Sequence, residues 1–221
     1  MLDTRLILIE GIAGSGKTTT GRKLAEEIQS RGFKAEFCHE FSKSNPVRED
    51  NDLGTRHWIA KTLRNWRAFV SNLAHSDRIV VLDGPVLQCT VAELLERGAD
   101  DDTVVQYVFQ ELEIIKPLKP AVVYFYQDDI ESALRKAFNQ RSAAWQKKVV
   151  TYLSNLEFGR RRTAKGFDLY LELNREIRRI SDRLFEQLTI RKIGIENSEP
   201  DWGAIYDRIC RFLGLFASAE Q

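Results

Sequence analysis

The sequence predicts an α/β domain with a doubly wound parallel sheet, and three observations lead to that prediction. Several apolar runs do not alternate with polar residues, which is typical of strands buried on both faces of a parallel sheet. Patterns with apolar residues three and four apart, typical of helices, fall between these runs. The first run leads directly into a glycine-rich loop. The length of 221 residues suits one such domain, which we expect to span residues 1–216.

Five runs are expected to form the strands: Leu6–Glu10, Ala35–His39, Ile79–Asp83, Ala121–Tyr126 and Ile190–Ile195. In sheets of this kind, ligands bind at the carboxyl ends of the strands. The residues that follow the strands are therefore candidates for a site. Those we single out are Glu10-Gly11, His39-Glu40, Asp83-Gly84-Pro85 and Gln127-Asp128-Asp129.

Helices are expected between the strands. Ile59, Leu63, Trp66, Val70 and Leu73 recur at spacings of three and four, which indicates one buried helical face. Asp101 or Asp102 is expected to cap a helix that reaches Ile115 and stops before Pro117. Further helical patterns lie after the glycine-rich loop (Leu24, Ala25, Ile28), at Val149–Leu156, at Leu173–Leu184, and from Ser198–Asp201 to about Leu213.

The glycine-rich loop reads Gly-Ile-Ala-Gly-Ser-Gly-Lys-Thr at residues 11–18, a complete GxxxxGK[ST] pattern. Its glycines let backbone N–H groups surround a phosphate, and the following helix adds its positive end. Lys17 would place a charge between the β- and γ-phosphates, and the Thr18 hydroxyl would ligate Mg²⁺. We therefore expect ATP or GTP to be bound by Gly11, Ala13, Gly14, Ser15, Gly16, Lys17, Thr18 and Thr19.

Two carboxylates at strand ends are candidates for chemistry. Asp83 follows four apolar residues, the Walker-B form, and could hold Mg²⁺ together with Thr18; the alternative is a turn residue. Glu40 closes the second strand and could act as the general base for an attacking hydroxyl; the alternative is a surface glutamate. Because strand residues alternate faces, His39 and Glu40 are not expected to share a cleft.

A basic segment follows the fourth strand. Residues 135–165 hold nine basic side chains against one acid, Glu157, and would cover the nucleotide as a lid. Arg135 and Arg141 are the candidates for stabilising the transferred phosphoryl group. They can both face the phosphates if the helix breaks after Phe138; the alternative is a solvated helix face. The run Arg160–Arg162 is more typical of a surface.

Aromatic and basic residues near the second strand could contact a phosphate acceptor. Trp66 fits the buried helical face, and core packing is also favoured for Trp58 and Phe69, although stacking on a planar ring stays open for these two. Lys43, Arg48 and Arg56 could bind a phosphate of the acceptor, without a spacing that supports it.

Composition excludes several classes of protein. A formal net charge of +1 gives no general case for nucleic acid or membrane binding, and there is neither an 18-residue apolar run nor a secretory leader pattern. The three cysteines are widely spaced, so no disulfide framework or CxxC metal site is implied, and Cys38 and Cys210 are expected in the core. A cytoplasmic protein is expected, a homodimer is left open, and residues 217–221 are expected to fray.

The glycine-rich loop at residues 11–18 is a phosphate-binding loop, or P-loop, by its pattern. This P-loop, the strand that ends at Asp83 and the basic lid, in this order, resemble the P-loop kinases, in particular the thymidylate-kinase-like branch that includes the deoxynucleoside kinases. This resemblance implies a three-layer P-loop NTPase fold with five parallel strands in the order 2-3-1-4-5. It also implies Mg·ATP as phosphate donor, an acceptor between the second-strand loop and the helices that follow, and lid arginines near the phosphates. Thymidylate kinases carry Glu-Pro-Gly where this chain has Glu40-Phe41-Ser42, and Asp-Arg-aromatic where it has Asp83-Gly84-Pro85.

These departures leave the acceptor open. The chain is expected to be an ATP-dependent phosphotransferase that acts on a nucleotide, a nucleoside or a similar small molecule. A non-nucleotide acceptor, such as an antibiotic or a metabolite, is the nearest alternative; a cleft lined by carboxylates would favour a polycationic acceptor. A non-catalytic ATP-binding module is a second alternative. A nucleic-acid-end kinase that uses Arg160–Lys165 is a third, disfavoured by the mixed charges of residues 172–183.

Overall fold

The computed structural model describes residues 3–48 and 54–215. Within these residues, five strands form one parallel sheet in the order β2-β3-β1-β4-β5. The strands are β1 (Leu6–Gly11), β2 (Ala35–Cys38), β3 (Ile79–Asp83), β4 (Ala121–Tyr126) and β5 (Arg191–Glu196). The predicted α/β class, the parallel sheet and the order 2-3-1-4-5 of a P-loop NTPase fold are confirmed.

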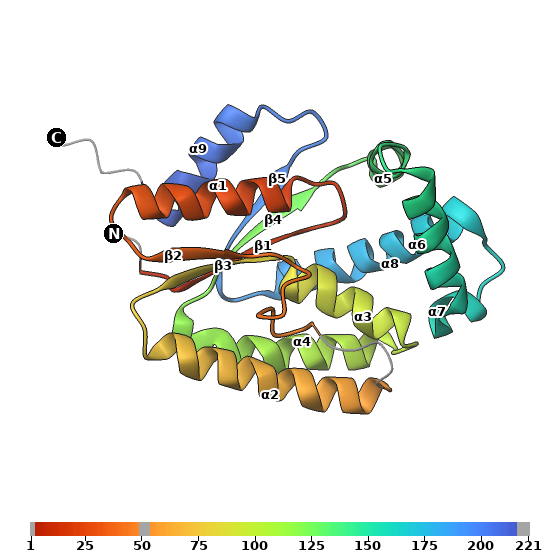
Figure 1. Ribbon diagram of the computed structural model, residues 1–221, viewed down its shortest axis with the longest axis horizontal. Helices are drawn as coiled ribbons and strands as arrows, with labels where there is room; N and C mark the ends of the chain where they lie inside the picture. Colours follow the sequence, from red (N-terminus) through yellow and green to blue (C-terminus); the bar gives the residue numbers. More distant parts are fainter. Residues whose placement is uncertain (1–2, 49–53, 216–221) are drawn as a thin grey trace.

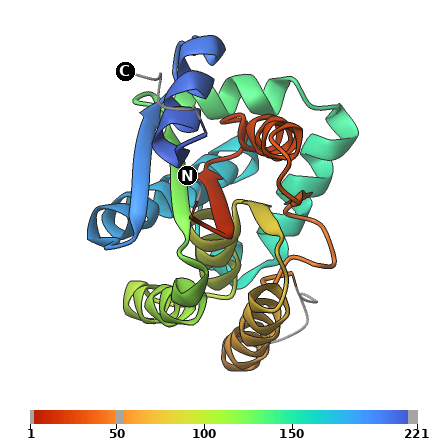
Figure 2. The same cartoon turned by 90° about the vertical axis from the view of Figure 1, so that its left-hand side faces the viewer.

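Helices cover both faces of this sheet (Figures 1 and 2). On one face lie α1 (Lys17–Ser30) and α9 (Trp202–Leu213). The other face carries a thicker layer, which includes the long helix α8. The members of this layer are α2 (Thr55–Ala74), α3 (Val91–Glu96), α4 (Asp101–Ile115) and α8 (Gly166–Gln187).

The segment between β4 and α8 runs beyond the carboxyl ends of the strands (Figure 1). It contains α5 (Ile130–Asn139), α6 (Ala143–Asn155) and α7 (Glu157–Arg160). Two short helical stretches complete the described chain: the π-helical η1 (Pro85–Thr90), directly after β3, and the 3₁₀ stretch η2 (Lys116–Leu118), directly before β4.

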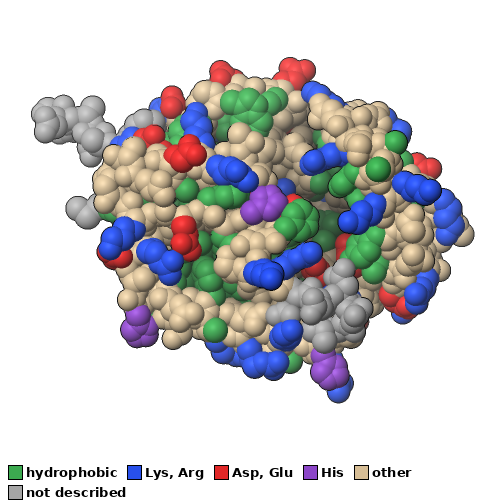
Figure 3. All heavy atoms as spheres, in the orientation of Figure 1, with side chains coloured by type: hydrophobic (Ala, Val, Ile, Leu, Met, Phe, Trp, Pro, Cys, Tyr) green, Lys and Arg blue, Asp and Glu red, His purple; other side chains and the backbone are tan. Residues whose placement is uncertain are grey.

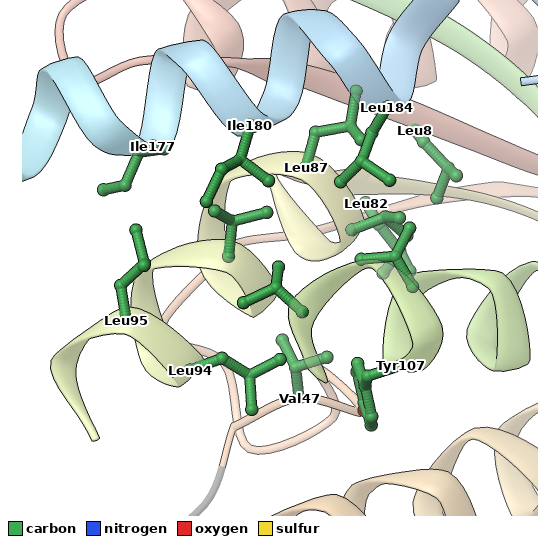
Figure 4. Close-up of a cluster of buried hydrophobic side chains, with 14 of the residues drawn as sticks. Leu8, Val47, Leu82, Leu87, Leu94, Leu95, Tyr107, Ile177, Ile180 and Leu184 are labelled. Carbon is green, nitrogen blue, oxygen red and sulfur yellow. The ribbon is translucent and has the colours of Figure 1, made fainter. Parts of the chain in front are cut away.

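The central strand β1 supplies both cores, because successive side chains of a strand point to opposite faces. Leu6 and Leu8 belong to the larger core, between the sheet and α3, α4 and α8, whereas Ile7 and Ile9 belong to the smaller core, between the sheet and α1 and α9. Figure 4 shows the larger core, where Leu87, Ile180 and Leu184 converge with Leu8 and other buried side chains from several elements. This double burial explains the non-alternating apolar strands.

Several boundaries differ from expectation for local reasons. The side chain of Asp100, rather than Asp101 or Asp102, caps α4 by accepting a hydrogen bond from the Thr103 N–H. The second strand ends at Cys38 rather than His39, and α6 ends before Leu156. The break expected after Phe138 lies one residue later, because α5 ends at Asn139. The expected frayed tail lies outside the described residues.

The expected core residues are confirmed. Trp58 and Trp66 are fully buried, and Cys38 and Cys210 are buried as well. In the part of the chain that the structure describes, no helix is long and apolar enough to cross a membrane.

Candidate functional site

The P-loop joins β1 to α1 at the centre of the sheet, and its backbone requires glycine. Gly11 has φ +137°, and a Cβ there would lie 2.5 Å from the Phe125 carbonyl oxygen of the neighbouring strand. Gly16 has φ +89° and precedes α1 as its N-cap. The Lys17 side chain folds back over the loop, where its Nζ donates to the Ile12 carbonyl oxygen at 3.0 Å. A loop with this backbone can surround a phosphate with N–H groups, and the buried Lys17 ammonium group lies beside it.

The hydroxyl group of Thr18 meets the carboxylate of Asp83. Thr18 Oγ1 donates to Asp83 Oδ2 at 2.6 Å, so the two residues predicted to hold Mg²⁺ lie together. Asp83 is fully buried, and its other oxygen, Oδ1, has no hydrogen-bond partner among the described residues. An uncompensated buried carboxylate oxygen is costly unless a cation or a water molecule contacts it. This pair therefore fits a hard cation such as Mg²⁺, although the described residues hold no group of three or more metal-binding side chains.

His39 and Glu40 point to different parts of the site. His39 Nε2 lies 4.0 Å from Asp83 Oδ2, and its Nδ1 accepts the Phe41 N–H at 3.2 Å. Glu40 Oε2 instead lies 3.4 Å from Gln88 Nε2 and 3.9 Å from Cys89 Sγ. As expected, the two side chains do not share one position. Strand alternation is not the cause, because β2 ends before both residues.

Glu10 is a fully buried carboxylate at the end of β1, just before the P-loop. Its two oxygens accept the N–H groups of Val86 at 2.8 Å and Gln88 at 3.1 Å. Burial raises the pKa of Glu10 to about 7, against the opposing effects of these hydrogen bonds and of the Lys17 charge. The end of β1 thus fixes the start of η1, which carries Gln88 and Cys89.

A cavity of about 520 Å³ opens beside the P-loop, with Ala13 in its wall. Glu40 and Phe41 line one side, η1 and α3 line another, and α6 and α8 close the rest. Figure 3 shows hydrophobic side chains and charges of both signs around a hollow right of centre on this face. A cavity of this size suits a small-molecule ligand. The side chains from α3, α6 and α8 that line it are Ala92, Glu93, Glu96, Trp145, Lys148, Val149, Tyr152, Leu153, Tyr170, Leu173, Asn174 and Ile177.

The two arginines predicted in the lid have different surroundings. Arg135 Nη2 pairs with Glu131 at 2.8 Å, and its guanidinium lies 4.4 Å from the centre of the Phe167 ring. Arg141 follows the end of α5, and its guanidinium lies 5.4 Å from the centre of the ring of Trp145, a residue that lines the cavity. Arg141 is thus beside the cavity, whereas Arg135 is engaged with α8 and its own helix.

Only some of the other residues predicted to contact an acceptor line the cavity. Arg48 lines the cavity, whereas Trp58 and Phe69 do not; Phe69 instead packs edge-on against Trp66. The cavity's aromatic lining comes from Phe41 and from α6 and α8. In the run Arg160–Arg162, Arg161 pairs with Glu157 and Arg162 with Glu172, as on an ordinary charged surface.

Asn197 is a site residue that the sequence reasoning missed. Its side chain donates from Nδ2 to the Ser15 carbonyl oxygen at 2.7 Å and accepts from Gln127 Nε2. It directly follows β5, so the rule that selected the ends of the other strands would have found it. Trp202, the first residue of α9, packs on Gly16, where a Cβ would collide with its ring. The carboxyl end of β5 and the start of α9 therefore hold the P-loop in place through Ser15 and Gly16.

Neither a protein-family model nor a curated protein matches this sequence. Among solved structures, the chain is similar to the YorR protein of Bacillus subtilis, whose structure was determined in complex with phosphorylated GDP. The TM-score is 0.55 at 16% sequence identity, over 95% of this chain and 96% of that chain. The similarity extends over nearly the whole length of both chains, and at this identity it shows a shared fold.

Proposed function

We propose that this protein is an ATP-dependent phosphotransferase that transfers the γ-phosphate of Mg·ATP to a small acceptor. The observation that carries the proposal is the cavity beside the P-loop, with the Glu40 carboxylate in its wall. A P-loop alone would support nucleotide binding; a second pocket next to it provides a place for an acceptor. The nucleotide in the YorR structure, which has the same fold, agrees with a nucleotide site here.

The donor would bind through the P-loop residues Gly11–Thr19, with Lys17 beside the β- and γ-phosphates. Thr18 and Asp83 would hold Mg²⁺, which supplies charge stabilisation for the phosphates when bound. His39 Nε2 lies 4.0 Å from Asp83 Oδ2, so it could contact a water molecule bound at Asp83. The preference for ATP over GTP follows the resemblance to kinases.

The acceptor would occupy the cavity with its hydroxyl group towards Glu40. Glu40 would orient this hydroxyl and accept its proton, while Gln88, beside it, holds the carboxylate in place. Arg141, which lies against Trp145 of the cavity lining, would be the lid arginine that approaches the transferred phosphoryl group. Arg135 would need to leave Glu131 to do the same.

The test is the Mg·ATP-dependent release of ADP by purified protein in the presence of nucleosides, nucleoside monophosphates and amino-bearing antibiotics. Acceptor-dependent release that the Lys17→Ala variant lowers by a factor on the order of 100 or more supports the proposal. Lys34→Ala is the matched control, because Lys34 forms an exposed pair with Asp77 away from the loop. Lys17-dependent ATP binding without turnover for any acceptor would contradict phosphotransfer and favour a binding module.

A further inference from the structure

One side of the cavity carries a row of side chains that the transfer chemistry does not use. Cys89, Glu93 and Glu96 line it at spacings of four and three residues, so they follow one face of the η1–α3 segment. Cys89 lies beside Glu40 at 3.9 Å. With a helical rise of about 1.5 Å per residue, Glu96 lies on the order of 10 Å farther along the segment. Glu96 therefore marks the end of the cavity away from the reacting hydroxyl.

Glu93, in the middle of this row, is already matched by cations. Arg97 donates to the Glu93 carbonyl oxygen at 2.8 Å and also pairs with its carboxylate. Arg48 Nη1 lies 4.0 Å from the same carboxylate. These two arginines face a carboxylate rather than an empty anion site, which weakens the earlier alternative that Arg48 binds a phosphate of the acceptor.

Glu96 has a different environment. Its Oε2 accepts a hydrogen bond from the Tyr152 hydroxyl at 2.8 Å. Burial, followed by repulsion from Glu93, raises the pKa of Glu96 to about 7. A carboxylate in such surroundings is stabilised by a ligand that brings an N–H donor or a positive charge.

The lining of the cavity holds more acidic than basic side chains, which disfavours a second phosphate group. Three carboxylates (Glu40, Glu93 and Glu96) line the cavity, against Arg48 and Lys148. The rest of the wall is largely apolar and includes four aromatic side chains, which suit a flat molecule. They are Phe41, Trp145, Tyr152 and Tyr170.

Resting on the phosphotransfer proposed above, we infer that the acceptor is an unphosphorylated alcohol with a flat body and an amino group that binds Glu96. Its hydroxyl lies at Glu40 and its amino group at the opposite end, where Glu96 and Tyr152 meet. A nucleoside monophosphate would instead bring a dianion among the carboxylates of the cavity. Repulsion between the phosphate and these carboxylates would disfavour binding.

The experiment measures kcat/KM for matched acceptors with Mg·ATP. Cytidine and uridine differ in an amino group against a carbonyl oxygen, cytidine 5′-monophosphate adds a phosphate, and an aminoglycoside supplies amino groups without a flat ring. We expect cytidine to exceed both uridine and its monophosphate by about tenfold or more. In Glu96→Gln, KM for cytidine should rise by about 10- to 100-fold while KM for uridine changes little.

A control variant, a second test variant and the affinity for ATP separate recognition from folding. Glu113→Gln removes an exposed carboxylate that pairs with Lys116 and should change neither KM. Tyr152→Phe keeps the ring but removes the hydroxyl that donates a hydrogen bond to Glu96, and it should also raise KM for cytidine. An ATP affinity equal to that of the original protein shows that each variant is folded.

Three results would overturn the inference, and they are distinct. Preference for the monophosphate would exclude an unphosphorylated acceptor but would leave phosphotransfer intact. Preference for the aminoglycoside would exclude the flat body in the same way. Absence of turnover with every acceptor, while Mg·ATP still binds through Lys17, would overturn the proposed function as well.

Discussion

Gly14 of the P-loop packs against Ala137 of α5 so closely that a Cβ at Gly14 would lie 2.7 Å from the Ala137 Cβ. Gly14 also has φ +82°, a conformation that other residues rarely adopt. Because Ala137 belongs to the segment that carries Arg141, this contact joins the phosphate-binding loop directly to the proposed lid. The position of α5 thus depends on the absence of a side chain at residue 14.

We expect Gly14→Ala to displace α5 and to weaken ATP binding, because the new methyl group meets Ala137 and strains the loop. The affinity for ATP should fall by about tenfold or more, measured by calorimetric titration. Gly32→Ala is the control: Gly32 also has a positive φ, but a Cβ there meets nothing within 4 Å. Equal losses in both variants would show that strain alone, and not the contact with α5, sets the effect.

Asp83→Asn should separate metal binding from nucleotide binding. The amide keeps the size of the side chain and an oxygen for the Thr18 hydroxyl, but removes the charge that a cation would meet. We expect the increase in ATP affinity on adding Mg²⁺ to shrink by about 10- to 100-fold, with little change in the absence of Mg²⁺. ATP titrations with Mg²⁺ and with a chelator measure both values. An unchanged Mg²⁺ effect would remove Asp83 from the metal site.

Glu40→Gln should lower kcat by about 10²- to 10⁴-fold, because the amide cannot accept a proton from the acceptor. KM for ATP should stay the same, since Glu40 faces the cavity and not the P-loop. Steady-state kinetics with a saturating acceptor provide the measurement. Glu36→Gln, an exposed change on the preceding strand that removes the pair with Arg78, is the control and should behave as the original protein. A retained kcat would reduce Glu40 to an acceptor-binding residue.

Glu10 predicts a dependence of stability on pH. Its pKa is about 7 in the folded protein and near the ordinary value of 4.5 in the unfolded chain, so the folded state holds the proton more strongly. The free energy of unfolding should therefore fall as pH rises from 4.5 to 7, by roughly 3 kcal/mol, and change little above that range. Urea unfolding at several pH values measures it.

Because Glu96 titrates in the same range, the relevant quantity is the difference in unfolding free energy between the original protein and Glu10→Gln. This difference in the free energy of unfolding should fall by roughly 3 kcal/mol between pH 4.5 and 7. A difference independent of pH would mean that Glu10 keeps an ordinary pKa in the folded protein.

Asn197→Ala should destabilise the protein, because the Ser15 carbonyl group and the Gln127 side chain lose a buried partner. An unsatisfied buried group costs about 1–3 kcal/mol. Thermal unfolding with and without ATP measures both the loss and its effect on the loop. Ser198→Ala, an exposed change at the next residue, should alter stability far less. Comparable losses would indicate that the whole turn, rather than Asn197, supports Ser15.

The sequence predicted the sheet and the P-loop because these depend on local patterns. The central strands β1, β3 and β4 are largely apolar since the sheet is covered on both faces, and the loop sequence follows from a backbone that tolerates few other residues. Thr18 and Asp83 could also be paired in advance, because Asp83 ends one strand and Thr18 follows the loop after another, and the carboxyl ends of parallel strands meet at one edge. Their contact depends on strand order, which the family resemblance implied and the fold confirms.

The cavity could not be predicted in the same way. Glu96 and Tyr152 are distant in the sequence and lie on separate helices, and their meeting depends on how α6 packs over α3. Trp58 illustrates the converse: it departs from the strict helical stripe and yet is fully buried, because α4 supplies Tyr107 against it. Pairings between helices of this kind leave no periodic signal.

The anchoring of η1 by Glu10 has a consequence for how new selectivity could be built into this chain. The first turn after β3 is held by the strand that ends in the P-loop, whereas Ala92, Glu93 and Glu96 lie on the turns that follow. Under the proposed function, the turn that lies beside the base Glu40 and the turns that contact the far end of the acceptor are therefore separate parts of one continuous segment. Exchanging the side chains of the later turns would then be a route to altered acceptors that leaves the P-loop and its support by β1 untouched.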